Sequence, residues 1–323
     1  MLTTISSPEG LTATITTVGA SVVSLLVPAA GGEPVDVVLG LSNEDDYRDN
    51  PTFIGASVGR CVNRIAGARF SLNGTEYQLT ANDGANCNHS GRDFWAMREW
   101  ELLEADEEHV TLGLHSPDGD QGFPGEADVT ATYRLDGSAL EVIYAATVSE
   151  PTIVNMTNHA YFNLNGHDSG SAMSHKLCID ASERLVSDET VLPTGAIAPV
   201  AGTAWDFRSL RAIDAAMPTS GFDSCFVLSN DGQLRHAARL VGDKSGIVMD
   251  LFCDQPGMQL YTANFATDDR GKDGASYVPR EAVCLEPGIH PDAIHHPEWP
   301  SPVFSPERPF LWRMRLEFST AES

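Results

Sequence analysis

The side chains best suited to chemistry gather in residues 153–166, which read Ile-Val-Asn-Met-Thr-Asn-His-Ala-Tyr-Phe-Asn-Leu-Asn-Gly. His159 gains and loses a proton near neutral pH, and four amides surround it: Asn155, Asn158, Asn163 and Asn165. Amides donate and accept hydrogen bonds without adding charge. We therefore expect a site for a polyhydroxylated ligand, with Tyr161 and Phe162 as flat apolar surface. Taken alone, the stretch favours the alternative, a core histidine with satisfied hydrogen bonds.

Glu286 is a second candidate for proton transfer. It follows the apolar run Val283-Cys-Leu285 and stands immediately before Pro287. A carboxylate that leaves a strand into a constrained loop is partly desolvated, which raises its pKa toward values useful to a base. Asp223, the pair Asn63-Arg64 and the run Asn86-Cys-Asn88-His89 are further polar groups in apolar or turn-like surroundings. A purely structural role is the alternative for each.

The motif Gly55-Ala-Ser57-Val-Gly59 matches the nucleophile elbow of serine hydrolases. That motif requires a strand, a sharp turn and a helix within a parallel sheet. Here it is followed by Arg-Cys-Val-Asn-Arg-Ile-Ala-Gly, which predicts no helix of useful length. We expect the glycines to serve close backbone packing instead.

Two other segments resemble metal sites superficially. His290, His295 and His296 lie within seven residues, but their spacing matches no zinc pattern and the nearby prolines prevent a helical presentation. Residues 268–274 lack the alternating acids and final glutamate of a calcium loop. The sequence therefore predicts neither a metal nor a cofactor.

The overall charge restricts the partners. The 323 residues carry 45 acids and 20 bases, a net charge of −25, which opposes nucleic acid and anionic membranes. No apolar run is long enough to cross a bilayer and no secretory signal is recognisable at the start. Six dispersed cysteines without a Cys-x-x-Cys pair predict reduced thiols in a cytoplasmic protein.

The elements that must position these side chains are predicted to be strands. Apolar residues alternate at 11, 13 and 15, at 110, 112 and 114, at 129, 131, 133 and 135, and at 310, 312, 314, 316 and 318. Turn dipeptides punctuate the strands: Asn73-Gly74, Asp136-Gly137, Asn165-Gly166 and Asp231-Gly232. Residues 42–49 carry the best helical signal. The pattern predicts an all-β protein, a large antiparallel sandwich or barrel.

The chain shows no composition shift or flexible linker, so residues 1–323 are expected to form a single domain. The proline-rich piece 287–309 cannot be a central strand, because each proline removes a donor from the hydrogen-bond ladder. We expect a long ordered loop there, the kind of segment in which sites are built.

The motifs together resemble the aldose 1-epimerases, the galactose mutarotase family. The most telling piece is Asn158-His159-x-Tyr161-Phe-Asn-Leu164. The nine collinear matching pieces are residues 59–60 with 63–65, 70–74 with 77–79, 86–91, 122–125, 158–164, 206–208, 221–223, 259–264, and 285–286 with 291–293. The resemblance implies a large antiparallel β-sandwich with few short helices, and an isomerase that needs no cofactor.

The resemblance also assigns roles to six residues. It makes Glu286 the general base and His159 the general acid, flanking a cyclic hemiacetal from opposite sides, and it implies that Glu286 is ionised and His159 protonated at the start. The implied substrate-binding residues are Arg64, His89, Asp223 and Gln259. The expected substrate is a free aldohexose such as glucose or galactose, and the expected assembly is a monomer or homodimer.

Two departures from the family pattern put the preferred sugar in doubt. Ser90 stands where the family has glycine, in Asn88-His89-Ser90-Gly91, and Gly288 stands where it often has glutamine, beside Glu286. Two alternatives stay open: a non-catalytic sugar-binding β-sandwich, and an epimerase for a phosphorylated or otherwise modified sugar. The latter calls for basic groups in the pocket, and Arg64 is the only base at a matched position.

Overall fold

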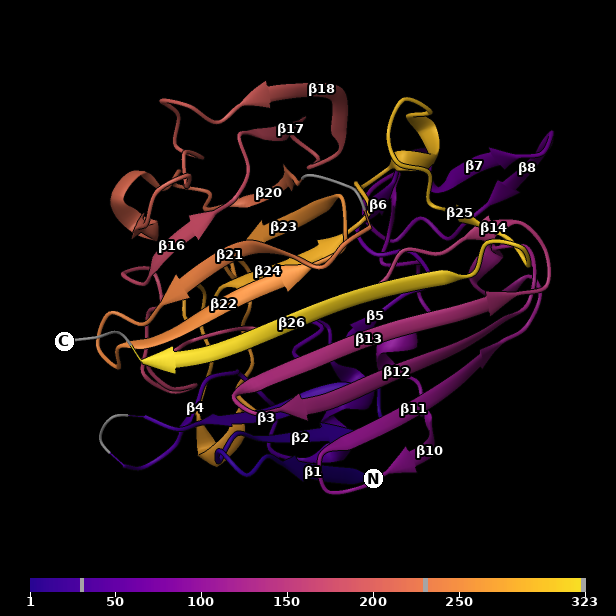
Figure 1. Ribbon diagram of the computed structural model, residues 1–323. Coiled ribbons are helices and arrows are strands. Elements are labelled where there is room, and N and C mark those ends of the chain that lie inside the picture. Colours follow the sequence, from indigo (N-terminus) through magenta and orange to yellow (C-terminus); the bar gives the residue numbers. More distant parts are fainter. Residues whose placement is uncertain (30–31, 229–231, 321–323) are drawn as a thin grey trace.

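A computed structural model describes residues 1–29, 32–228 and 232–320. Its largest element is an antiparallel sheet of nine strands, whose longest members run across the molecule (Figure 1). In spatial order the strands are β10 (Glu101–Ala105), β11 (His109–Ser116), β12 (Ala127–Asp136), β13 (Ala139–Val148), β26 (Phe310–Thr320), β22 (Ile247–Cys253), β21 (Arg235–Val241), β16 (Lys176–Ile179) and β19 (Arg211–Ala212).

A five-stranded sheet carries part of the site. Its order is β18 (Pro193–Pro199), β17 (Glu183–Ser187), β20 (Asp223–Val227), β23 (Gly257–Tyr261) and β24 (Cys284–Gly288). The first part of the chain forms a third sheet of β1 (Leu2–Ser6), β2 (Thr12–Thr16), β3 (Ser21–Val27) and β4 (Val35–Asp36). Short pairs complete the structure: β14 (Thr152–Ile153) with β25 (Val303–Phe304), β15 (Thr157–Asn158) with β5 (Ser57–Val58), β6 (Arg64–Ile65) with β9 (Cys87–Asn88), and β7 (Arg69–Leu72) with β8 (Thr75–Gln78).

The helices within the described ranges are all short 3₁₀ turns. They are η1 (Glu44–Asp49), η2 (Ala66–Ala68), η3 (Trp95–Met97), η4 (Asp120–Gly122), η5 (Ile213–Ala216), η6 (Lys272–Gly274) and η7 (Ala293–His295). The helical signal predicted at residues 42–49 corresponds to η1, which begins with three acidic residues. No helix of the described residues is long and apolar enough to span a membrane.

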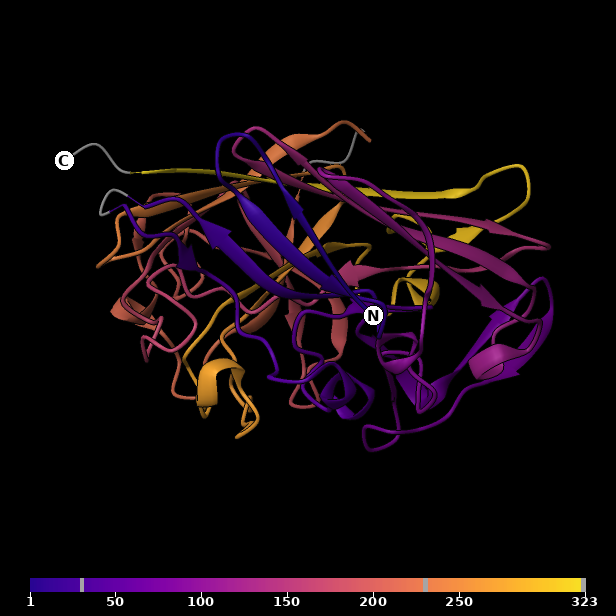
Figure 2. The same cartoon turned by 90° about the horizontal axis from the view of Figure 1, so that it is seen from below.

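The predicted period-two alternation is confirmed where it was strongest. In β26 the buried face consists of Phe310, Trp312, Met314, Leu316 and Phe318. In β12 it consists of Val129, Ala131, Tyr133 and Leu135. The main hydrophobic core joins these faces to residues of the first sheet, from Ile5 to Val27. Figure 2 shows the consequence for the layers: β26 runs along one face of the molecule, and loops and short helices gather on the opposite face.

Two of the predicted turns close hairpins. Asp136 pairs with Ala139, so Gly137 and Ser138 alone connect β12 to β13, and Gly137 has a positive φ of 60° that suits such a tight turn. Asn73 and Gly74 connect β7 to β8 in the same way. Asn165-Gly166 makes a turn but joins no paired strands, and Asp231 lies outside the described residues.

The proline-rich segment behaves largely as expected. Pro287 lies within β24, but β24 is the edge strand of its sheet, so the missing donor interrupts no ladder. The rest is ordered loop with η7 and the two-residue strand β25. The carbonyl oxygen of Pro287 accepts hydrogen bonds from Trp312 Nε1 at 2.8 Å and Thr157 Oγ1 at 2.9 Å. The long strand β26 therefore supports the edge strand on which Glu286 stands.

This support predicts the effect of changing Trp312, which is fully buried and packs on Tyr144 with ring centroids 4.8 Å apart. We expect Trp312→Phe to lower the free energy of unfolding by about 1–3 kcal/mol, because a hydrogen bond and part of the ring are lost. Trp312→Ala should cost about 3–5 kcal/mol. Urea denaturation measures both. Leu311→Ala, on the exposed face of the same strand, is the control and should change stability by about 0.5 kcal/mol or less. A Trp312→Ala protein with unchanged stability would contradict this supporting role of Trp312.

Candidate active site

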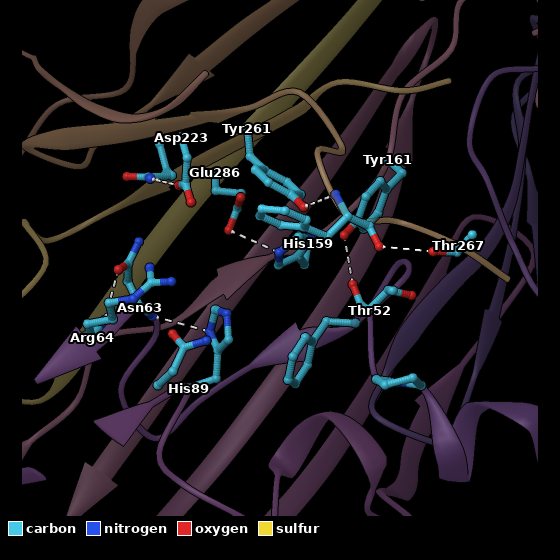
Figure 3. Close-up of a pocket in the computed structure, with 15 residues that line it drawn as sticks. Thr52, Asn63, Arg64, His89, His159, Tyr161, Asp223, Tyr261, Thr267 and Glu286 are labelled. Atoms are coloured by element: carbon cyan, nitrogen blue, oxygen red, sulfur yellow. Dashed lines mark hydrogen bonds and ion pairs between the residues drawn. The ribbon is translucent and has the colours of Figure 1, made fainter. Parts of the chain in front are cut away.

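The six residues predicted from the sequence line one cavity. Its volume is about 480 Å³, within the range of small-molecule pockets. Figure 3 shows Glu286 and His159 pointing toward one another, with Arg64 and His89 on one side and the rings of Tyr161 and Tyr261 on the other. The lining comprises Pro51, Thr52, Phe53, Asn63, Arg64, Asn88, His89, His159, Tyr161, Asp223, Gln259, Tyr261, Phe265, Thr267 and Glu286.

Glu286 is placed by the register of β24. It lies opposite Gln259 of β23, and its side chain is only 6 % exposed. Burial raises the pKa of Glu286 well above its usual value, and the nearby carboxylate of Asp223 raises it further. The carboxyl group of Glu286 therefore stays protonated to a higher pH than a carboxyl group in water.

His159 follows β15 and is fixed at its backbone. Its N–H donates to the carbonyl of Ala56 at 2.8 Å, and its carbonyl accepts from Gly55 at 3.0 Å. The ring stacks on Tyr161 with centroids 5.0 Å apart. Burial lowers the pKa of His159 to about 4.

The two proton-transfer groups are neighbours: His159 Nε2 lies 3.7 Å from Glu286 Oε2. They therefore open onto the same cavity, as the sequence prediction requires. The expectation that they flank a ligand from opposite sides is wrong, because 3.7 Å leaves no room for a ring between them. They stand side by side and can reach two adjacent oxygen atoms of one ligand.

Burial works against the expected starting protonation. The sequence prediction has an ionised Glu286 and a protonated His159, but burial shifts the two pKa values in the opposite directions. Burial therefore favours a neutral carboxyl beside a neutral imidazole. This pair holds the same single proton as the ion pair, so only the position of that proton differs.

The four amides do not line the pocket, contrary to the expectation that they meet a ligand. Asn155 forms two hydrogen bonds with the backbone of Ile289, donating to its carbonyl at 3.0 Å and accepting from its N–H at 2.9 Å. Asn158 donates to Gly55 and to two tyrosine hydroxyls, Asn163 to the carbonyls of Gly170 and Glu281, and Asn165 to Asp243. They brace backbone and core, because buried peptide groups need partners. Phe162 likewise lies in the core, and only Tyr161 faces the cavity.

Arg64 and His89 enter from the pair β6 and β9. The guanidinium of Arg64 donates from Nε to Asp83 Oδ2 at 2.7 Å, which orients it at the cavity. His89 Nδ1 accepts the backbone N–H of Asn63 at 3.2 Å, so in the neutral ring Nε2 carries the hydrogen. Burial, followed by the charges of His159 and Arg64, lowers the pKa of His89 well below its usual value. His89 is therefore a neutral donor.

Asp223 and Gln259 form a polar pair on adjacent strands. Gln259 Nε2 donates to Asp223 Oδ1, and Gln259 Oε1 has no partner. Burial raises the pKa of Asp223 despite the opposing effects of Arg64 and Gln259. Both residues line the cavity near Glu286, where a carboxylate and an amide suit ligand hydroxyls.

Sequence reasoning missed most of the aromatic wall. Phe53, Tyr261 and Phe265 line the cavity with Tyr161. The ring centroids of Phe53 and His89 lie 4.6 Å apart, and Phe265 is 79 % exposed at the rim. Tyr261 belongs to a matched motif and was detectable there, whereas Phe53 and Phe265 lie in loops without a periodic signal.

The excluded motifs have other roles. Ser57 is fully buried, and its hydroxyl bonds to the carbonyl of Ala20 and to the hydroxyls of Tyr133 and Tyr144, so it is no nucleophile. His290 bonds to the carbonyl of Pro256 and His295 to Asp292, and the three histidines do not converge.

The two departures lie close to the site. Ser90 accepts the N–H of Cys61 and donates to its carbonyl, so its side chain ties two loops together. A Cβ at Gly288 would lie 3.2 Å from Asn155 Oδ1, where it would crowd the bond to Ile289. Neither residue lines the main cavity.

Comparison with known proteins gives a consistent result. The family model described as aldose 1-epimerase matches residues 1–317. The chain is 37% identical to galactose mutarotase of Mus musculus over 311 residues, covering 94% of this chain and 90% of that protein. It is 35% identical to aldose 1-epimerase of Escherichia coli K12 over 310 residues, covering 93% of this chain and 89% of that protein.

Solved structures agree. An aldose epimerase homologue from C. elegans superposes with a TM-score of 0.94 at 29% identity, covering 100% of this chain and 99% of that one. The galactose 1-epimerase from Lactobacillus acidophilus superposes with a TM-score of 0.84 at 26% identity, covering 99% of this chain and 94% of that one. These matches establish the predicted antiparallel β-sandwich.

The buried pair predicts an unusual titration of His159. We expect its imidazole to be neutral above about pH 5, because the pKa lies near 4 and protonation occurs only below it. Histidine NMR during a pH titration measures this, with the signal assigned by its loss in His159→Asn. Exposed His115, whose pKa is raised by Asp128, is the internal control and should titrate above 6.5. A His159 ring that is charged at pH 7 in the protein without added sugar would refute the neutral pair.

Proposed function

The chain belongs to the aldose 1-epimerase family, and we propose that it interconverts the α and β anomers of a free aldohexose such as glucose or galactose. The observation that carries the proposal is the contact of His159 Nε2 with Glu286 Oε2 at 3.7 Å inside a cavity lined with polar groups. The reaction requires one proton donor and one proton acceptor, which a pair that holds a single proton provides.

The reaction removes a proton from one oxygen of the sugar and adds a proton to the neighbouring oxygen. A base removes the proton from the anomeric hydroxyl, an acid protonates the ring oxygen, and the bond between C1 and the ring oxygen breaks to give the open-chain aldehyde. Rotation about the C1–C2 bond and closure on the other face restore the ring. Both oxygens are bonded to C1, which suits two groups that stand side by side.

We assign the base to Glu286 and the acid to His159. Burial favours the neutral pair, so we expect sugar binding to move the proton from Glu286 to His159. Sugar hydroxyls that donate to the carboxylate would favour its charged form, as would the positive charge of Arg64 in the same cavity. The groups exchange roles when the ring closes.

The remaining assignments concern binding. Arg64 and His89 would donate to sugar oxygens, whereas Asp223 and Gln259 would accept from hydroxyls. The faces of Tyr161 and Phe53 offer apolar surface for the sugar ring. We take residues 1–323 as one domain, since the main core draws on both Ile5 and Phe318, and propose a reducing, cytoplasmic setting from six free cysteines.

The two alternatives fit the site less well. A binding-only protein would not need an acid and a base 3.7 Å apart. A phosphorylated sugar requires unpaired cations, but Arg64 is the single lysine or arginine among the described lining residues and is ion-paired to Asp83 at 2.7 Å. A neutral monosaccharide is the better fit.

The role of Glu286 is tested by Glu286→Gln. Replacing the carboxyl by an amide removes the base, and we expect kcat to fall by about 10²- to 10⁴-fold while sugar binding persists. Polarimetry of freshly dissolved α-glucose or α-galactose measures the rate. Glu76→Gln, exposed on β8, is the control and should turn over normally. Near-normal turnover by Glu286→Gln would remove this residue from the mechanism.

The substrate class is tested by a panel of free and phosphorylated aldoses. We expect kcat/KM to be at least about tenfold higher for free hexoses, since the cavity offers no unpaired cation to a phosphate. Acceleration confined to the phosphorylated sugars would overturn the free-sugar assignment. Binding of a sugar without any acceleration would favour the non-catalytic alternative.

A further inference from the structure

A third reactive side chain lies beside the proton-transfer pair and has no part in the proposed reaction. Cys284 begins β24, two residues before Glu286, so both side chains project from the same face of the strand. It is fully buried and packs in a hydrophobic cluster with Tyr161 and Tyr261. Its thiol is free.

The three side chains converge. One ligand atom each from His159, Cys284 and Glu286 lie within 4.8 Å of one another, and all three residues are buried. Ligand atoms bound to one tetrahedral Zn²⁺ at its usual bond lengths stand about 3.3–3.6 Å apart. The separation of 3.7 Å between His159 and Glu286 nearly meets this distance. The widest separation in the group, up to 4.8 Å, would have to shorten by about 1 Å when the metal binds.

From this convergence we propose that His159, Cys284 and Glu286 form an inhibitory site for a thiophilic divalent cation, represented by Zn²⁺. Imidazole, thiolate and carboxylate are all zinc ligands, and three protein ligands with one open position are typical of accessible zinc sites. His159 and Glu286 line the cavity of about 480 Å³, which offers room for a water ligand in the fourth position and a route of entry.

Inhibition follows from the identity of the ligands. The cation would occupy the lone pair of His159 and the carboxylate of Glu286, so neither could transfer a proton to a sugar. The thiol proton and the proton of the pair would leave to solvent as the metal bonds form. This consequence depends on the proposed function, whereas metal binding itself does not.

The surroundings favour a reversible site over a permanent one. Zinc-binding histidines usually donate their second ring N–H to an acceptor, and losing such a partner typically weakens affinity about 10- to 100-fold. His159 Nδ1 is buried and has no partner. The acidic chain, with its net charge of −25, attracts cations generally, but the thiolate selects Zn²⁺ over Mg²⁺ and Ca²⁺.

The test compares Cys284→Ser with the unaltered chain by polarimetry in thiol-free buffer. Cys284→Ser keeps both proton-transfer groups, so its inhibition is measured against its own metal-free rate. We expect Zn²⁺ to inhibit the unaltered protein, EDTA to restore the rate, and Mg²⁺ to have no effect. The concentration of Zn²⁺ for half inhibition should rise at least about tenfold in Cys284→Ser and in Cys284→Ala.

A matched control is Cys253→Ser, a buried cysteine of β22 outside the cluster, which should keep full sensitivity to Zn²⁺. Equal inhibition of the unaltered protein and both Cys284 variants, or no inhibition at all, would overturn the proposal.

A second readout is independent of turnover. Titration with Co²⁺ should give a thiolate-to-cobalt absorption band in the unaltered protein and in Cys253→Ser, and none in Cys284→Ser. If the unaltered protein bound Co²⁺ through the thiol but failed to accelerate mutarotation, the metal site would stand and the proposed function would fall. Normal mutarotation without the band or inhibition would leave the function intact and remove the metal site.

Discussion

The attachment of the His159 segment to an edge strand is the constraint on which the rest of the site depends. β24 has a partner strand on one side only, so some of its peptide groups need other partners. Side chains provide them: Thr157 and Trp312 donate to the carbonyl of Pro287, and Asn155 bonds to both backbone groups of Ile289. The same contacts that satisfy the edge hold His159 and Glu286 at a fixed separation.

Burial gives the pair its chemical character. Two opposite charges removed from water lose more solvation than their attraction readily returns, and burial therefore favours the neutral forms of His159 and Glu286. The proton remains within the pair, 3.7 Å from its alternative site. A ligand that supplies hydroxyl donors can shift its position without changing the total charge, which is the requirement of a reaction that begins and ends with a neutral sugar.

The cavity is assembled from segments that are distant along the chain. Loop residues 51–53 face strands β6, β20, β23 and β24 across it, and the site is completed by the residue that follows β15. Hydrogen bonds within each wall, such as those from Gln259 to Asp223 and from Arg64 to Asp83, set the direction of the polar groups. The buried thiol of Cys284 lies close to His159 and Glu286. We propose that it gives these two residues an affinity for soft cations that the proton transfer does not require.

The sequence by itself determined the strands, because alternation along β12 and β26 reflects burial of one face, and it determined the family through motifs that recur in order. It also provided the six polar residues that share the cavity. Only the tertiary structure decided that Asn155, Asn158, Asn163 and Asn165 brace the backbone, since the direction of a loop side chain depends on the peptide groups around it. The protonation of the pair and the approach of Cys284 likewise depend on burial and distance between separate segments, which no local pattern contains.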